Sequence, residues 1–125
     1  MRAIVIDDAR GVRALLRRML ALEGFEVEAC ITGADALTLI GGHAVAPAPT
    51  FALATVDLGL ADTDGVHLVQ AILEISPATQ VLVVTGHSTS SFVPAVLRAG
   101  AFDVLYKPFD RVALQDALRR VGLIE

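Results

Sequence analysis

The sequence predicts an α/β domain in which a five-stranded parallel sheet is doubly wound, with helices on both of its faces. Two observations lead to this fold class. Short runs of apolar, mostly β-branched residues alternate five times with segments of helical period. Several of these runs are apolar throughout, which is typical of strands that are buried on both faces and joined by helical crossovers. The length of 125 residues fits one domain spanning 1–125.

The first two strands and the helix between them are predicted from a change of period. Residues 3–6 form a continuous apolar run that is too short for a helix and ends at Asp7 and Asp8. A helix begins near Val12, and Gly24 ends it. Its expected apolar stripe consists of Val12, Leu15, Leu16, Met19 and Leu22. Residues 25–30 alternate between polar and apolar, which predicts a strand near an edge of the sheet.

The middle of the chain contains the one stretch with the composition of a linker. Residues 33–40 predict a short helix, and 51–56 predict the third strand. Between them, the glycines and prolines of 41–50 predict a loop. Because strands continue on both sides, we interpret it as a surface loop and not as a domain boundary. Residues 65–75 predict the next helix, and Pro77 lies just beyond its end.

The last third of the chain repeats the alternation twice. Strands are predicted at 80–85 and 103–106. The helix predicted at 90–100 tolerates Pro94 in its first turn if Ser90 or Ser91 caps it. The final helix, 110–123, has Asp110 as its expected cap. Its apolar stripe is expected to be Leu114, Ala117, Leu118 and Val121.

Composition excludes several classes of protein. A net charge of −4 argues against non-specific binding to nucleic acid, which needs a basic surface. No apolar run reaches the ~20 residues that span a bilayer, and the N-terminus lacks the pattern of a signal peptide. Cys30 is the only cysteine, so no internal disulfide can form and a reducing compartment is the simpler assumption. We therefore expect a cytoplasmic protein without membrane contact.

Polar side chains follow four of the predicted strands at the point where each strand ends. They are Asp7, Asp8, Asp57, Thr85 and Lys107. In a parallel sheet these residues meet at one edge, beside the switch point where ligands bind. Three carboxylates repel one another; Lys107 can neutralise one, and Mg²⁺ suits the others. A carboxylate nucleophile, a divalent ion and a lysine together favour phosphoryl transfer, in which Thr85 could bind a phosphoryl oxygen.

With these residues in place, the chain resembles the receiver domains of two-component response regulators. Four motifs carry the resemblance, in order and each at a strand end. They are Asp7-Asp8, "DLGLADTDG" from Asp57, Thr85, and "AGAFDVLYKPF" around Lys107 and Pro108. The resemblance covers essentially the whole chain and implies the (βα)5, flavodoxin-like fold.

The family resemblance also implies a role for each site residue. Asp57 would accept a phosphoryl group from a phosphohistidine of a sensor kinase or a phosphotransfer protein. Asp8 and Asp57 would bind Mg²⁺ (or Mn²⁺) through their side chains, Gly59 through its backbone carbonyl, and Asp7 through water. Lys107 would pair with the phosphoryl group and Thr85 would move toward it. The Lys107–Pro108 bond is expected to be cis.

The sequence departs from the family pattern near the site. The family usually has a proline where Ala61 stands, an aromatic residue where Val104 stands, and an alanine where Gly86 stands. Tyr106 is aromatic and, in a strand, shares a face with Val104. Gly59 and His87 occupy variable positions that in this family tune the lifetime of the phosphoryl group. These departures put the coupling of Thr85 to an aromatic switch in question.

The resemblance predicts a signalling switch that is an enzyme only in catalysing its own aspartyl phosphorylation and dephosphorylation. Its partners would be the kinase or phosphotransfer protein and an output domain or protein, with homodimerisation possible on phosphorylation. The chain either works alone or is the N-terminal part of a longer protein. Two alternatives stay open. One is a receiver-like binding module that takes no phosphate, and the other is a small phosphatase with an aspartyl nucleophile.

The remaining polar residues favour structural roles. Asp62 and Asp64 are interpreted as turn residues and not as ligands. His43, His67 and His87 have no ligand spacing, and Cys30 is expected to be a small apolar residue at a strand end. The arginines of the first helix form a solvated face or a docking face for the phosphodonor. They are Arg10, Arg13, Arg17 and Arg18.

Overall fold

The computed structural model describes residues 1–42, 51–86 and 92–125 and contains one parallel sheet. Its strands are β1 (Arg2–Ile6), β2 (Glu26–Cys30), β3 (Leu53–Val56), β4 (Gln80–Thr85) and β5 (Asp103–Tyr106). The helices are α1 (Arg10–Leu22), α2 (Gly33–Gly42), α3 (Gly65–Ile75), α4 (Phe92–Ala99) and α5 (Arg111–Arg120). The predicted fold class is confirmed.

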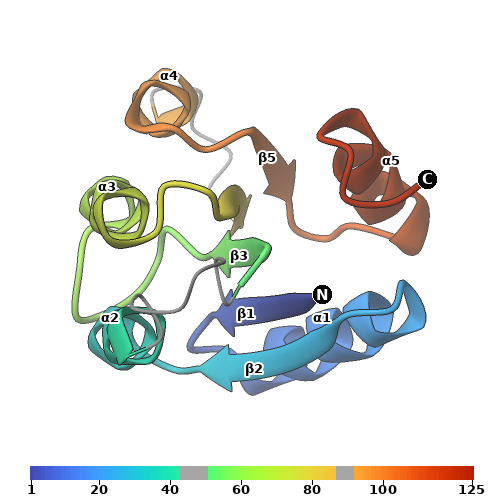
Figure 1. Cartoon of the computed structure of the whole chain (residues 1–125), viewed down its shortest axis with the longest axis horizontal. Coiled ribbons are helices and arrows are strands. Elements are labelled where there is room, and N and C mark those ends of the chain that lie inside the picture. The colour runs from blue at the N-terminus through green and yellow to red at the C-terminus, as the bar shows by residue number, and fades with distance from the viewer. Residues whose placement is uncertain (43–50, 87–91) are drawn as a thin grey trace.

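The sheet has the strand order β2-β1-β3-β4-β5, and every neighbouring pair is parallel. Helices α1 and α5 cover one face, and α2, α3 and α4 cover the other (Figure 1). β2 lies at an edge, as its alternating sequence predicted, and β5 lies at the opposite edge. The chain order reverses between β1 and β3, so the switch point lies between these two central strands.

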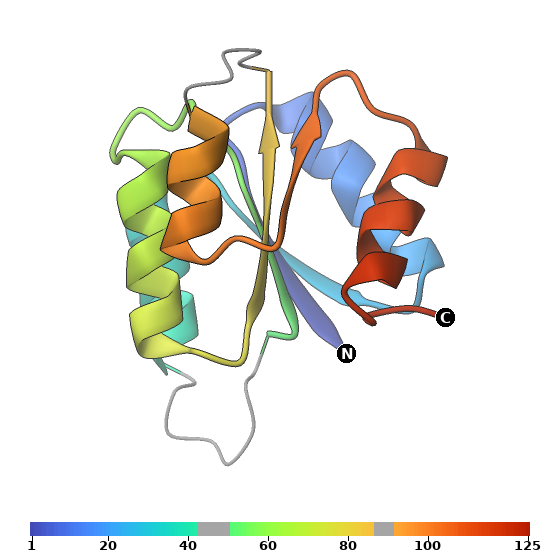
Figure 2. The same cartoon turned by 90° about the horizontal axis from the view of Figure 1, so that it is seen from above.

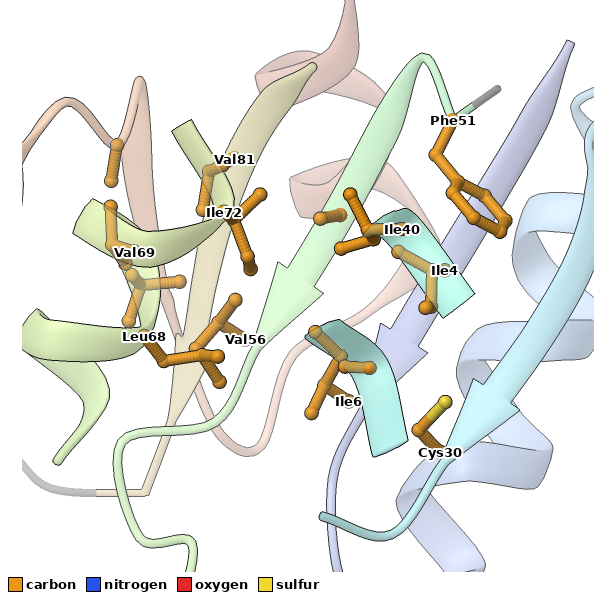
Figure 3. Close-up of a cluster of buried hydrophobic side chains, with 14 of the residues drawn as sticks. Ile4, Ile6, Cys30, Ile40, Phe51, Val56, Leu68, Val69, Ile72 and Val81 are labelled. Carbon is orange, nitrogen blue, oxygen red and sulfur yellow. The ribbon is translucent and has the colours of Figure 1, made fainter. Parts of the chain in front are cut away.

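Each face of the sheet has its own apolar core. On the side of α2, α3 and α4, Val56 of β3 lies beside Leu68 and Ile72 of α3, and Ile4 of β1 lies beside Ile40 of α2 (Figure 3). On the side of α1 and α5, alternate residues of the same strands pack against the two helices. Both faces of β1 and β3 are therefore buried, which explains why their sequences are apolar throughout.

The apolar stripe predicted for α1 is partly wrong. Leu16 and Leu20 are the buried residues of this helix, whereas Leu15 and Leu22 are 41% and 60% exposed. The residues that face the sheet follow i, i+4 spacing from Val12, so Leu20 belongs to the stripe. The prediction chose Leu15 and Leu22 because apolarity alone does not show which side of a helix faces the sheet. In α5 three of the four predicted residues, Leu114, Ala117 and Leu118, are buried, whereas Val121 is the C-cap beyond the helix and is only partly buried.

Several predicted boundaries moved, among them the end of the last helix, which lies at Arg120 and not at 123, and one cap is confirmed. Helix α2 continues through Gly41 and Gly42, which the prediction had placed in the surface loop. The rest of that loop, 43–50, lies outside the described residues, as do Ser90 and Ser91, the predicted cap of the helix that is observed from Phe92. Asp110 caps α5 as predicted, because its carboxylate accepts a hydrogen bond from the Ala113 N–H.

No helix in the described part of the chain combines the length and apolarity that crossing a membrane requires.

Thr55 in β3 gives a test of the core on the α1 and α5 side. Its side chain is buried, and its hydroxyl has no hydrogen-bond partner among the described residues. Because valine has the same shape without the polar group, Thr55→Val should stabilise the protein by about 1 kcal/mol. Urea unfolding with an unchanged m-value would measure this.

Thr79 offers the matched control. It is equally buried, but its hydroxyl donates to the Phe51 carbonyl oxygen at 2.8 Å. Thr79→Val should therefore destabilise the protein by about 1 kcal/mol. If both substitutions destabilise, the Thr55 hydroxyl has a partner after all.

Candidate functional site

The sheet brings the predicted site residues to one edge, and backbone hydrogen bonds fix three of them there. The Asp7 N–H donates to the Cys30 carbonyl oxygen, the Asp57 N–H to that of Ile6, and the Lys107 N–H to that of Thr85. Each bond extends the parallel ladder by one residue beyond the end of a strand. Figure 2 shows the arrowheads of β4 and β5 directed to the same edge. The side chains are thus held by the rigid sheet and not by free loops.

Three carboxylates form a compact cluster at this edge. Oxygen atoms of Asp7, Asp8 and Asp57 all lie within 4.8 Å of one another. Asp7 and Asp57 are buried, at 2% and 7% exposure, and Asp8 is exposed. The cluster therefore opens to solvent on the side of Asp8.

Lys107 is the cation of the cluster. Its Nζ atom lies 2.8 Å from Asp7 Oδ2 and 3.6 Å from Asp57 Oδ1. The shorter distance shows that Lys107 is hydrogen-bonded to Asp7, which also accepts from the Ala9 N–H. With one ammonium and three carboxylates, the cluster keeps a formal charge of −2 when all are ionised. A divalent cation with oxygen ligands fits this donor set and charge.

Burial makes Asp57 hard to ionise. Its removal from water raises the pKa of the carboxyl group above the ordinary value, and the charges of Asp7 and Asp8 raise it further. The Gly59 N–H, which donates to Asp57 Oδ1 at 3.2 Å, and the ammonium of Lys107 oppose this rise. A cation bound beside Asp57 would favour the ionised form that a nucleophile needs.

Thr85 and the residues of β5 lie beside this cluster. Thr85 is buried at the end of β4, and in the register of the sheet it is opposite Tyr106. Val104 is partly buried against the core on the α3 and α4 side, while Tyr106 is 44% exposed. The Lys107–Pro108 peptide bond is cis, as predicted. The aromatic ring of this strand thus lies at the surface.

Other residues have the structural roles that were predicted. Asp64 caps α3 by accepting from the Val66 N–H. Cys30 is buried, and burial is the main cause that raises the pKa of its thiol to about 11, so the thiol is inert at neutral pH. His67 is exposed on α3, whereas His43 and His87 lie outside the described residues.

Asp62 has a role that the sequence did not reveal. Its carboxylate reaches across to α2 and accepts from the N–H groups of Gly33 and Ala34. These bonds lower the pKa of Asp62 below its ordinary value. The residues lie 29 and 28 positions apart in the chain, so no local pattern connects them.

An open parallel sheet with a reactive edge at its switch point defines the doubly wound α/β proteins. Within this class, the model of the response regulator receiver domain matches residues 3–119. The chain therefore belongs to the response regulator receiver domain family. Receiver domains are signalling switches of two-component systems and not classical enzymes.

A named relative supports this assignment. The photosynthetic apparatus regulatory protein RegA of Rhodobacter capsulatus is 30% identical over 119 residues, which are 95% of this chain and 61% of RegA. The chain thus spans less than two thirds of that protein.

Two solved structures are also similar. A response regulator from Burkholderia pseudomallei, determined with a phosphorylated aspartic acid, calcium ion and citrate, has 29% identity and a TM-score of 0.81, and the match covers 94% of this chain and 65% of that one. A CheY-like receiver domain from Methanospirillum hungatei has 26% identity and a TM-score of 0.85, covering 96% and 91%.

Proposed function

We propose that Asp57 is the phosphoacceptor of a signalling switch and takes its phosphoryl group from a phosphohistidine of a kinase or phosphotransfer protein. One observation carries the proposal: a buried carboxylate at the end of a central strand lies 3.6 Å from an ammonium and beside two further carboxylates. A structural carboxylate needs no such cluster. The acid set is instead suited to hold a cation against a phosphoryl group.

In the proposed reaction, a carboxylate oxygen of Asp57 attacks phosphorus and forms an O–P bond. The P–N bond to the histidine breaks, and its electron pair stays on the imidazole nitrogen. Lys107 can reach the added oxygens, because its Nζ atom lies 3.6 Å from Asp57 Oδ1. Hydrolysis by water later returns the free carboxylate and inorganic phosphate, so the domain catalyses only its own modification.

The metal of this proposal is Mg²⁺ or Mn²⁺. Asp8 and Asp57 would hold it through their side chains, Gly59 through its backbone carbonyl, and Asp7 through water. The bound ion would neutralise charge on the phosphoryl oxygens. Asp7 suits an indirect role because Lys107 and the Ala9 N–H already occupy its oxygens.

Phosphorylation would change the charge of the edge and so bias a two-state element. The group adds roughly 1.5 to 2 negative charges and several acceptor oxygens. Thr85 and Lys107, on adjacent strand ends, would gain contacts with it. The surface presented to an output domain or partner would then change. We place this activity in the cytoplasm and in the one domain formed by 1–125.

The test is incubation with acetyl phosphate and Mg²⁺, followed by intact mass, for the wild type and Asp57→Asn. We expect a mass gain of one phosphoryl group that the variant loses completely. Amide NMR with beryllofluoride, a mimic of the phosphoryl group, should show shifts that spread from Thr85.

Other outcomes would favour the other functions. With neither a mass gain nor a beryllofluoride response, the domain would be a binding module that takes no phosphate. Turnover of a phosphomonoester would indicate a phosphatase, which Gly59 argues against because that class has a second acid two residues after the nucleophile. Shifts confined to the cluster would mean that the site works without coupling through β5.

A further inference from the structure

The β3–α3 loop (residues 57–64) is tied to a helix that does not border it in sequence. Asp62 Oδ1 accepts from the Gly33 N–H and Asp62 Oδ2 from the Ala34 N–H, each at 3.0 Å. Both carboxylate oxygens are used, and both donors belong to the first turn of α2. A carboxylate at a helix N-terminus also interacts favourably with the helix dipole. The loop that begins at Asp57 is therefore anchored at a fixed point outside itself.

Close packing at the same place shows that the contact is built into the structure. A Cβ atom on Gly33 would lie 2.6 Å from Thr63 Cγ2, so only glycine lets the loop approach α2 this closely. At the other end, a Cβ atom on Gly65 would lie 2.9 Å from Leu58 Cα, so the loop also folds back tightly on itself. Thr63 directly follows Asp62, and the close pair Leu58 and Gly65 encloses it in the sequence, so both approaches restrict the segment that contains Asp62.

A simple helix cap does not explain Asp62, because α2 already has a local one. The Thr32 hydroxyl oxygen accepts from the Asp35 N–H. Asp62 adds a bond between two elements. The loop residue with the most to gain from this anchor is Gly59, which is exposed and, as a glycine, has no side chain with which to fix its own position.

We propose that Asp62 is a positioning residue, which holds the β3–α3 loop against α2 and so fixes the backbone of Gly59, whose carbonyl would be a ligand of the metal. This inference rests on the proposed function, because it assigns the anchor to the metal site of Asp57. Without the Asp62 anchor the carboxylates stay in place, but the Gly59 carbonyl is no longer held in one position. The ion should therefore be bound less tightly. By reciprocity, binding of the ion should tighten the contact with α2.

The experiment is a Mg²⁺ titration followed by amide NMR on the whole chain. Asp62→Ala should weaken Mg²⁺ binding about tenfold. Asp62→Asn keeps one acceptor oxygen, so its Mg²⁺ affinity should fall between that of Asp62→Ala and that of the wild type. Asp35→Ala is the matched control: it removes one negative charge from the first turn of α2 but leaves the Asp62 anchor, and it should stay within about twofold of the wild type. The Gly33 and Ala34 amides should shift with Mg²⁺ only where the anchor is present.

A second change separates positioning from general loss of structure. Ala61→Pro restricts the backbone beside Asp62 and should restore part of the lost affinity in the Asp62→Ala background. Equal Mg²⁺ affinity of Asp62→Ala and wild type would overturn the inference, as would equal weakening by Asp35→Ala. If the wild type binds no Mg²⁺, the proposed function itself fails, and that result is distinct from either of these.

Discussion

Lys107→Met is expected to lower the free energy of unfolding by about 2 kcal/mol at pH 7. The lysine is hydrogen-bonded to Asp7, which is only 2% exposed. Methionine keeps most of the aliphatic chain, so the loss would come from a buried carboxylate left without its cation. Removing one partner of a buried pair costs about 3–5 kcal/mol, and we expect less because the lysine side chain is 21% exposed. Urea unfolding of Lys107→Met and the wild type, with a metal chelator present, would measure this difference in the free energy of unfolding.

Two comparisons test the cause of this loss. Mg²⁺ should stabilise Lys107→Met more than the wild type, because the cluster then carries one more uncompensated negative charge. The double variant Asp7→Asn with Lys107→Met should recover much of the stability, since the Asp7 charge that Lys107 compensates is then absent as well. If the double variant loses the sum of the two single effects, Lys107 acts through packing and not through Asp7.

Most of the fold could be predicted because each element carries its own signal. The five apolar runs and their helical crossovers imply a parallel sheet, and the alternation of residues 25–30 placed β2 at an edge. Helix α3 and strands β4 and β5 have the predicted limits. The errors arose where local pattern is ambiguous. The side of α1 that is buried is set by its packing against the sheet, which the helix sequence alone does not show. The two glycines at 41 and 42 were predicted to end the helix before them, but α2 includes both.

The site could be predicted in position but not in detail. Residues at the carboxyl ends of parallel strands must converge, so Asp7, Asp8, Asp57 and Lys107 could be grouped from the chain order. The preference of Lys107 for Asp7 over Asp57 depends on side-chain distances that no spacing encodes. Asp62 resembled any other turn aspartate, because its partners on α2 become neighbours only after the sheet has formed.

Asp57→Asn is expected to be more stable than the wild type at pH 7 without metal, in addition to its loss of phosphorylation. Burial raises the pKa of Asp57, so the folded protein holds the ionised form at a cost. Asparagine removes this charge and its repulsion with Asp7 and Asp8, and its oxygen can still accept from the Gly59 N–H. A gain of about 1 kcal/mol, or roughly 4 °C in Tm, is the size usual for removing such strain at a functional site.

The sign of the pH dependence follows from the raised pKa. The folded state binds the proton of Asp57 more tightly than the unfolded state does, so the wild type gains stability relative to the variant as pH falls through the folded pKa. The difference should vanish below the ordinary value of an aspartate, about 3.9. Thermal unfolding of both proteins between pH 3.5 and 8 would follow this change.

Mg²⁺ should reverse the order of the two proteins at neutral pH. An ion at 100 times its dissociation constant stabilises the folded state by about 2.7 kcal/mol, which exceeds the charge cost that the substitution removes. Asp57→Asn keeps Asp7 and Asp8 but lacks the buried carboxylate of Asp57, so Mg²⁺ should raise its Tm only weakly. A variant that is less stable than the wild type in a chelator would show that the Asp57 charge carries no cost in the folded state. An equal response of both proteins to Mg²⁺ would show that Asp57 is not a ligand.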